Sequence, residues 1–553
     1  MVRSPVAIVI AAAAAIAALL AWPLRQGSAF LDDHVFIAIG RHIDNPLVLL
    51  VQDSIGAYFF RPVVMFAWWA TAAVLGEAAP AHLAFNVAWH AGNGLLLFAL
   101  LRTTGVSAAP AGIAAVGFIA HPSAFSAAAW LSDRFDLFAT AFGLAALIAV
   151  ERYLEAPRRA LAAWAAIATL AALFSKEIGF ALAGLALLAI LWPDRERHAA
   201  GARARMRLFG LIAGCMLVAL AVRPLVLRSG PQETFFESGV LATVWGGLWT
   251  WIRELPGFLV VVHGNVLGVT AWILGLIGLV AAVLLPRARS ALFAGGLARI
   301  AGCGLALMLA AALAQAPVLN SLQLAGYTLE AFDYGSLAGS RLYYVPLAGF
   351  ALIAGAAGEA IVRAGLPRPA KLAAVVLIAC ALVGLVATSR SIGREWATYA
   401  RVRSDDFARA ALAAIAARRD LAPGCKIYLL ETPALAANFR DTADTAVKQA
   451  LPRGHPALGC FIQAEHAPWY HLVATGALPP DAEKPLETIQ VRGRAFEPLA
   501  LSNLSYYYLR IPDTPAVLDD PRAIFLVFRD GVFTDATAEV RARRRAVRFY
   551  DTR

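Results

Sequence analysis

The sequence predicts an α-helical polytopic membrane protein with a small α/β domain at its C-terminal end. Of the 553 residues, 60% are hydrophobic and 15% are charged, and the mean hydropathy is +0.66. Soluble globular proteins are much less apolar. Apolar runs of bilayer-spanning length, about 20 residues, recur up to residue 388. Beyond residue 400 the apolar runs shorten to the length of strands.

About eleven membrane helices are expected. Nine apolar runs have the length of a span, and they cover residues 5–24, 82–101, 107–125, 134–151, 207–227, 267–285, 291–314, 341–361 and 370–388. Between 159 and 193 the apolar stretch is broken at "SKE", which predicts two short helices that meet at Lys176 and Glu177. Segments 61–77 and 240–262 are rich in Trp, Phe and Pro, and we expect them to lie at the outer interface without spanning.

The basic residues indicate an orientation. Arg3 and the Lys and Arg clusters between alternate spans place the N-terminus in the cytoplasm and the tail outside, by the positive-inside rule. The net charge of +11 is therefore not read as a sign of nucleic-acid binding. A cleaved signal peptide within residues 1–29 is the alternative for the first span. Its long apolar stretch and the anchor formed by Trp22 and Arg25 favour a retained helix.

The chain is expected to divide into a transmembrane domain, residues 1–390, and an extracytoplasmic α/β domain, residues 391–553. In the tail, "KIYLL" (426–430) and "AIFLVF" (523–528) read as strands, and an Asp-Gly turn signal follows the second. Residues 405–418 have a helical pattern. Cys425 and Cys460 form either a disulfide or a free buried pair, and the sequence leaves both open.

Charged and polar residues gather where the spans should reach the outer side. A charge near the bilayer core costs several kcal/mol, so it usually faces protein or a wet cavity. Each group also has a structural explanation. Asp32 and Asp33 could cap a helix, Arg341 could reach the headgroups, and Lys176 could neutralise Glu177. Asp133, Arg134 and Asp136 could form a capped helix start with an internal ion pair.

Five stretches carry a family resemblance. They are "FLDDHVFI", "YFFRPVVMFAWW" with "AHLAFNVAWHAGNGLLL", "HPSAFSAAAWLSDRFDLFA", "LFSKEIGFALAG" and "SRLYYVPLAGF", between residue 28 and about 355. In this order they resemble the C-type (GT-C) membrane glycosyltransferases, most closely the membrane part of the transmembrane and tetratricopeptide-repeat O-mannosyltransferases and their bacterial relatives. The chain departs from that pattern in its short α/β tail, which replaces the repeats, and in Phe60, where a tyrosine is more usual.

The resemblance implies a GT-C-like bundle and a reaction. Such enzymes pass a sugar from a polyprenyl-phosphate carrier to an acceptor hydroxyl on the outer face, generally with inversion. It implies a general base at Asp32 or Asp33, and lipid-phosphate ligands at Arg61, Lys176 and Arg341, with Arg134 as a weaker candidate. A positioned carboxylate accelerates such a step by about 10² to 10⁴, and fixed cations stabilise the departing phosphate. The remaining candidates for substrate binding are His121, Asp133, Asp136, Glu177 and Tyr343.

No cofactor is expected. Asp32, Asp33 and Asp136 carry oxygen ligands that suit a hard cation, but the neighbouring cations already balance them, so no metal requirement is predicted. The five cysteines have no metal-ligand spacing. The expected partners are a lipid-linked sugar donor in the membrane and a glycan or protein acceptor, and no nucleic acid.

The frequent Ala, Arg and Gly indicate a bacterial source, hence the inner membrane and an undecaprenyl carrier. A lipid-linked sugar flippase or a secondary transporter is the alternative function, because broken helices and buried charges also mark transporters. A non-catalytic membrane scaffold is a third possibility. The sugar, the acceptor and the oligomeric state are not predicted.

Overall fold

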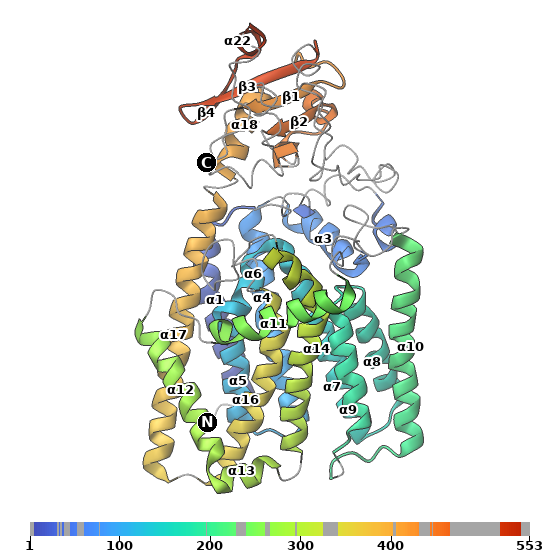
Figure 1. Ribbon diagram of the computed structural model, residues 1–553, viewed down its shortest axis with the longest axis vertical. Coiled ribbons are helices and arrows are strands. Elements are labelled where there is room, and N and C mark those ends of the chain that lie inside the picture. The colour runs from blue at the N-terminus through green and yellow to red at the C-terminus, as the bar shows by residue number, and fades with distance from the viewer. Residues whose placement is uncertain are drawn as a thin grey trace. The chain divides into compact units, whose positions relative to one another are not determined.

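Helices dominate the computed structural model (Figure 1). The structure describes residues 5–29, 33, 36–37, 45–51, 60–76, 78–194, 196–227, 239–259, 266–293, 296–324, 341–365, 367–401, 405–430, 443–444, 446–448, 450–464 and 520–542. The chain falls into two compact units, and each is described by itself. We call them the membrane unit (Met1–Arg25 and Leu83–Trp396) and the second unit (Gln26–His82 and Ala397–Arg553).

All eleven segments predicted to be membrane helices are helical. They are α1 (Pro5–Leu24), α4 (Ala79–Thr103), α5 (Ala108–Ala120) with α6 (Pro122–Ala129), α7 (Arg134–Glu155), α8 (Arg159–Leu173), α9 (Gly179–Leu191), α10 (Ala202–Leu227), α12 (Val266–Leu284), α14 (Leu297–Leu324), α16 (Tyr344–Ala364) and α17 (Arg368–Ala400). Seven of the described helices are long and apolar enough to span a bilayer, and the bent pair α5–α6 raises this to eight. The predicted class, an α-helical polytopic membrane protein, is confirmed.

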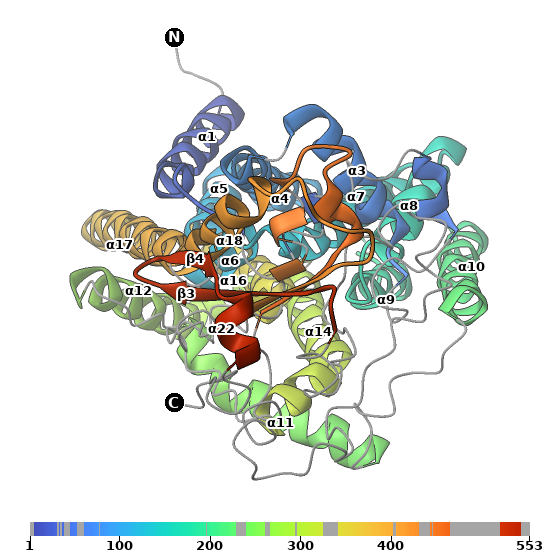
Figure 2. The ribbon, with the colours of Figure 1, turned by 90° about the horizontal axis from the view of Figure 1, so that it is seen from above.

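Most helices of the membrane unit stand side by side (Figure 1), and Figure 2 shows them from above. Helices α14 and α16 make a close crossing at two glycines. A methyl group on Gly304 would lie 2.5 Å from the carbonyl oxygen of Gly349, and one on Gly349 would lie 2.6 Å from that of Gly304. Small residues at a crossing let helix backbones approach where apolar side chains gain nothing by leaving lipid.

Helix α11 (Val240–Leu259) lies across the upright helices (Figure 1). Leu241, Trp245 and Trp249 on one face are exposed, whereas Thr243 and Trp251 are buried. An amphipathic helix with exposed tryptophans suits the membrane interface, as predicted for residues 240–262. The other segment predicted not to span contains α3 (Pro62–Leu75), a 14-residue helix of the second unit.

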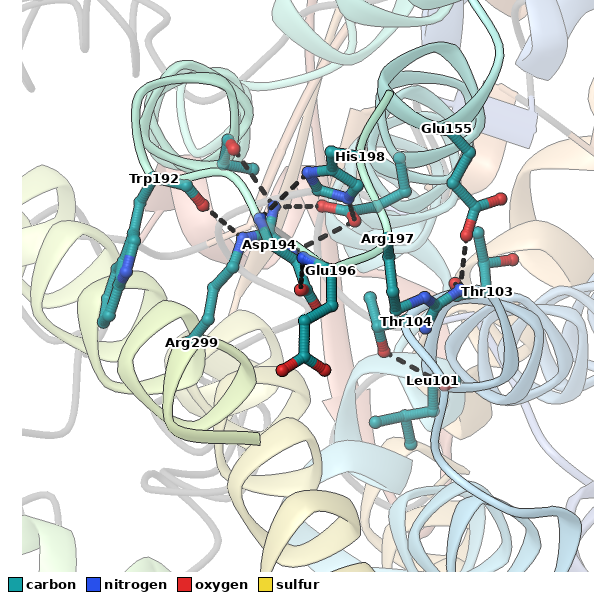
Figure 3. Close-up of polar contacts among 12 residues, drawn as sticks. Leu101, Thr103, Thr104, Glu155, Trp192, Asp194, Glu196, Arg197, His198 and Arg299 are labelled. Atoms are coloured by element: carbon teal, nitrogen blue, oxygen red, sulfur yellow. Dashed lines mark hydrogen bonds and ion pairs between the residues drawn. The ribbon is translucent and has the colours of Figure 1, made fainter. Parts of the chain in front are cut away.

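One end of the membrane unit is closed by a buried ionic network (Figure 3). Arg299, at the start of α14, donates to both carboxylate oxygens of Glu151, near the end of α7, at 2.5 and 3.1 Å. His198, in the loop between α9 and α10, lies 3.1 Å from the same carboxylate and accepts from the backbone N–H of Asp194. The C-terminal ends of α7 and α9 therefore meet the N-terminal end of α14, as alternating crossings require.

The second unit contains the predicted α/β domain. Its four-stranded sheet has the order β2-β1-β3-β4, from β1 (Lys426–Leu430), β2 (Phe461–Ala464), β3 (Ala523–Arg529) and β4 (Val532–Asp535). Strand β1 is parallel to β2 and to β3, and β3 is antiparallel to β4. The turn between β3 and β4 is the predicted Asp-Gly pair. Asp530 and Gly531 both have positive φ, as a two-residue hairpin of this type needs.

Helix α18 (Asp406–Ala416) packs on one face of this sheet, with Phe407, Ile427, Leu526 and Phe533 in the core between them. Cys425 and Cys460 form a disulfide, which decides between the two states that the sequence left open. The segment after α1 belongs to the same unit. Ser28 Oγ donates to Asp405 Oδ2 at 3.2 Å.

Candidate functional site

The site is formed where two helices are interrupted at one end of the membrane unit. Helices α5 and α6 meet at His121 with a bend of 54°. Pro122 is the first residue of α6, and His121 Nδ1 accepts from the backbone N–H of Ser123 at 3.2 Å. The 3₁₀ turn Leu131–Asp133 then leads into α7. Irregular backbone at membrane depth is tolerated where protein buries it or where it lines a cavity.

The second interruption is the predicted break at "SKE". Helix α8 ends at Leu173 and α9 begins at Gly179. A methyl group on Gly179 would lie 2.5 Å from the carbonyl oxygen of Ala172, so only glycine lets the new helix start so close to the old one. The break between α8 and α9 directs Lys176 toward α7. There its ammonium forms an ion pair with Oδ2 of the fully buried Asp136.

Asp133 lies between two cations. Its Oδ1 is 3.7 Å from Nζ of Lys176 and 3.7 Å from Nη1 of Arg341. The residue is 1% exposed, and neither of its oxygens accepts a hydrogen bond from the described part of the chain. Asp133 also makes no capping bond at the start of α7, so the structural explanation as a helix cap is not what places it there. A carboxylate oxygen can accept a hydrogen bond from a hydroxyl group.

Arg341 is the best placed of the predicted phosphate ligands in the membrane unit. Its guanidinium lies over the ring of Trp130, with Cζ 4.1 Å from the ring centroid. Its side chain is 27% exposed, and Nε finds no hydrogen-bond acceptor among the described residues. A guanidinium stacked on an aromatic face is held in place while its N–H groups stay available to phosphate oxygens.

Arg134 has a different environment. It is fully buried, its Nε donates to Oδ1 of Asn86 at 2.9 Å, and its Cζ lies 4.7 Å from the ring centroid of Phe85. Asn86 in turn donates to the carbonyl oxygen of Leu131 at 3.1 Å. Arg134 thus helps to fix the turn that carries Asp133.

Two other predicted residues contact neighbouring helices. The structural explanation offered above, that Lys176 neutralises Glu177, is wrong. Glu177 instead accepts a hydrogen bond from Arg223 of α10 at 2.6 Å. Tyr343 stacks on Trp251 of α11 with ring centroids 5.9 Å apart, and its hydroxyl donates to the carbonyl oxygen of Trp251 at 3.3 Å. Tyr343 therefore joins the interfacial helix α11 to the segment that carries Arg341.

Asp33 and Arg61 belong to the second unit, and Asp32 lies outside the described residues. Asp33 is 1% exposed, and Arg61 immediately precedes α3. The structure therefore brings Asp133, Asp136, Lys176 and Arg341 together, whereas the predicted base stays a prediction. Among the described residues, no three His, Cys, Asp or Glu side chains gather as a metal site.

Sequence reasoning missed two members of a polar stripe on α4, Asn86 and Asn93, and noted the third, His90, only as a polar residue of the outer side. Asn86, His90 and Asn93 are all fully buried and share one face of the helix. Asn86 holds Arg134, while His90 and Asn93 both contact the hydroxyl of Tyr344. The spacing of polar residues at i, i+4 and i+7 within an apolar span is the signal that could have revealed them.

No model of a known protein family matches the sequence, and no curated protein matches it. The chain is similar to two solved structures of ArnT from Cupriavidus metallidurans. One is bound to undecaprenyl phosphate, with 13% identity, a TM-score of 0.43, and coverage of 82% of this chain and 87% of that one. The other is in the apo state, with 14% identity, a TM-score of 0.39, and coverage of 85% and 91%.

At these identities and TM-scores the likeness extends no activity, substrate or residue role to this chain.

Proposed function

We propose that this protein is an inverting glycosyltransferase that moves a sugar from a polyprenyl-phosphate carrier to an acceptor hydroxyl, on a protein or a glycan, at the extracytoplasmic face. The observation that supports it is the cluster of Asp133, Lys176 and Arg341 at one end of the membrane unit. A carrier with a lipid tail and a phosphate needs cations held within a membrane bundle, and a sugar needs polar groups beside them.

The reaction assigns a base and a leaving group. Asp32 or Asp33 accepts the proton of the acceptor hydroxyl. The oxygen of that hydroxyl attacks the anomeric carbon from the face opposite the phosphate. The new glycosidic bond forms as the bond between the anomeric carbon and the phosphate oxygen breaks. The electron pair leaves with the phosphate, and polyprenyl phosphate is released. No cofactor or metal enters this scheme.

The cations stabilise the charge that grows on the leaving phosphate. Arg341, whose side chain is 27% exposed, makes the main contact, and Lys176 lies near the same oxygen of Asp133. Arg61 and Arg134 are the further candidates. Asp133 and Asp136 offer acceptor oxygens to sugar hydroxyls, and His121, Glu177 and Tyr343 are the remaining candidates for substrate contacts.

The position of the helix breaks supports a transporter less well than it supports a glycosyltransferase. Discontinuous helices of secondary transporters are interrupted near the bilayer midplane. Here the break at Lys176 lies beside Asp136, in the first turn of α7, and Asp133 precedes that helix. The breaks therefore lie at one end of α7 and not halfway along it, which suits chemistry at a membrane surface.

The test is substitution of the predicted base. Asp33→Asn, Asp32→Asn and the double variant are compared with Asp420→Asn, an exposed carboxylate of the same unit. Surface glycans and exported proteins are analysed by mass spectrometry in cells that make each variant, and release of free undecaprenyl phosphate is followed in proteoliposomes. We expect the double variant to lose transfer while it stays folded and inserted.

Full transfer by the double variant would show that neither Asp32 nor Asp33 is the general base. Movement of the carrier across the vesicle bilayer without a new glycosidic bond would favour a flippase. The same cells test the proposed location, a bacterial inner membrane with a cytoplasmic N-terminus and an extracytoplasmic C-terminal domain.

A further inference from the structure

The segment that carries Arg341 is fastened by a tyrosine that follows it closely. Tyr344 is the first residue of α16 and is fully buried. Its hydroxyl oxygen lies 2.9 Å from Nδ1 of His90 and 2.9 Å from Nδ2 of Asn93, both on α4. The 3₁₀ turn Arg341–Tyr343 leads directly into this residue. Arg341 is therefore only three positions from a hydroxyl with two partners.

The chemistry of the partners fixes the direction of every hydrogen bond. His90 Nε2 lies 3.0 Å from the carbonyl oxygen of Ile119, which can only accept, so Nε2 carries the hydrogen. In the neutral ring Nδ1 is then an acceptor, and the hydroxyl of Tyr344 donates to it. The amide Nδ2 of Asn93 can only donate, so it donates to Tyr344 and, at 2.9 Å, to the carbonyl oxygen of Leu137.

The same face of α4 holds the other side of the cation cluster. Asn86, seven residues before Asn93, donates to the carbonyl oxygens of Trp130 at 3.4 Å and Leu131 at 3.1 Å. Trp130 is the ring beneath Arg341. Helix α4 thus holds both Trp130, which lies below the guanidinium, and Tyr344, the residue at which the Arg341 turn joins α16. The polar stripe on α4 sets the distance between Arg341 and the Asp133 turn.

We propose that Tyr344, held by His90 and Asn93, is a positioning residue that places Arg341 for the phosphate of the lipid-linked donor. The inference rests on the proposed function, since it concerns the same phosphate. Tyr344 touches no substrate and acts only through the placement of Arg341. A displacement of about 1 Å at such a group reduces a rate by about 10²-fold. Without the hydroxyl, His90 Nδ1 and Asn93 Nδ2 lose a buried hydrogen-bond partner, and this would shift the Arg341 turn by such a distance.

The test is Tyr344→Phe, which removes the hydroxyl but keeps the ring and its packing on Phe118, with centroids 5.2 Å apart. Tyr153→Phe is the matched control. Its hydroxyl, on the opposite end of α7, donates to the carbonyl oxygen of Ala204 at 3.4 Å and is remote from the cluster. The dissociation constant of undecaprenyl phosphate is measured by quenching of tryptophan fluorescence, and kcat and KM are measured for sugar transfer.

We expect Tyr344→Phe to weaken binding of undecaprenyl phosphate by about tenfold and to lower kcat/KM by about tenfold to a hundredfold, while Tyr153→Phe does neither. In the background of Arg341→Gln, adding Tyr344→Phe should change nothing further, because residues that act as a unit are not additive. A purely structural role would instead lower thermal stability and weaken binding equally in both backgrounds.

Unchanged binding by Tyr344→Phe, beside a large loss by Arg341→Gln, would overturn the positioning role and leave the proposed function standing. No binding and no transfer by the unsubstituted protein would overturn both. If Tyr344→Phe does not accumulate as folded protein, Asn93→Ser removes the other hydrogen bond to the same hydroxyl. It must then shift the dissociation constant in the same direction for the inference to hold.

Discussion

Nη1 of Arg341 lies 3.7 Å from Oδ1 of Asp133, although the two residues begin different helices of the membrane unit. The carboxylate is buried and the guanidinium is partly exposed. An incoming phosphate would therefore compete with Asp133 for the same cation. This relationship leads to the first prediction.

Asp133→Asn should separate binding from catalysis. Loss of the negative charge leaves Arg341 without the carboxylate that competes with phosphate, while Lys176 keeps its ion pair with Asp136, so undecaprenyl phosphate should bind severalfold more tightly. Transfer should fall by about tenfold to a hundredfold, because a hydrogen bond from a sugar hydroxyl to a charged acceptor is lost. Glu155→Gln, at the far end of α7, is the control. Weaker phosphate binding by Asp133→Asn would contradict this assignment.

Lys176→Met should destabilise the protein by about 3–5 kcal/mol, because it leaves the charge of Asp136 buried without its partner. The double variant Lys176→Met with Asp136→Asn should recover most of that loss. Thermal unfolding in detergent measures both. Arg363→Met is the control, since the Arg363 side chain is 47% exposed and the buried carboxylate of Glu359 keeps a hydrogen bond from the backbone N–H of Ser107, so its loss should be smaller than that of Lys176→Met. Additive losses in the double variant would show that the pair is not coupled.

The ionic network at the other end of the membrane unit should matter for folding alone. Glu151→Gln leaves Arg299 without its carboxylate, and we expect a loss of about 3–5 kcal/mol. Since Glu151 is 17 residues along α7 from Arg134, it lies about 25 Å from the cluster. Binding of undecaprenyl phosphate by the folded fraction should be unchanged. A loss of affinity equal to that of Arg341→Gln would show that the two ends are coupled.

Asp520 should make the sheet of the second unit sensitive to acid. Hydrogen bonds from Lys426 and from the backbone and side chain of Arg522 hold the pKa of this carboxyl well below its usual range. Because the folded pKa is depressed, its stabilisation is complete above the unfolded value of about 3.9 and is lost as pH falls toward the folded value.

Hydrogen exchange of the amides of β1, corrected for the intrinsic effect of pH, measures this loss. Asp520→Asn should exchange faster at neutral pH and show a smaller change between pH 5 and 3. An unaltered pH dependence in that variant would assign the acid sensitivity to another group.

The sequence predicted the membrane helices and two of the four strands, but not which residues pair with the buried charges. Apolar runs predict membrane helices because length and hydropathy are local properties, and the strand at 426–430 was found with its observed bounds. The break at Lys176 was also predicted, yet its counter-ion was not. Its neighbour Glu177 pairs with α10, and Lys176 reaches α7. Such pairing depends on how helices pack, which hydropathy does not encode.

The site was predicted in part for a similar reason. The motif "SRLYYVPLAGF" drew attention to Arg341 and Tyr343, whereas Tyr344 was not singled out. Its importance is visible only when α4 and α16 lie together, so that His90 and Asn93 meet its hydroxyl. Polar residues within one span are a local signal, but their shared target belongs to another helix. The predicted base at Asp32 or Asp33 stays a prediction.

A structure of the protein with undecaprenyl phosphate bound is the most direct test of the proposed lipid-phosphate site. The account predicts phosphate oxygens within hydrogen-bond distance, about 3 Å, of the Arg341 guanidinium, with Lys176 beside them and Trp130 still beneath the arginine. A phosphate bound elsewhere, with Arg341 still directed at Asp133, would contradict it.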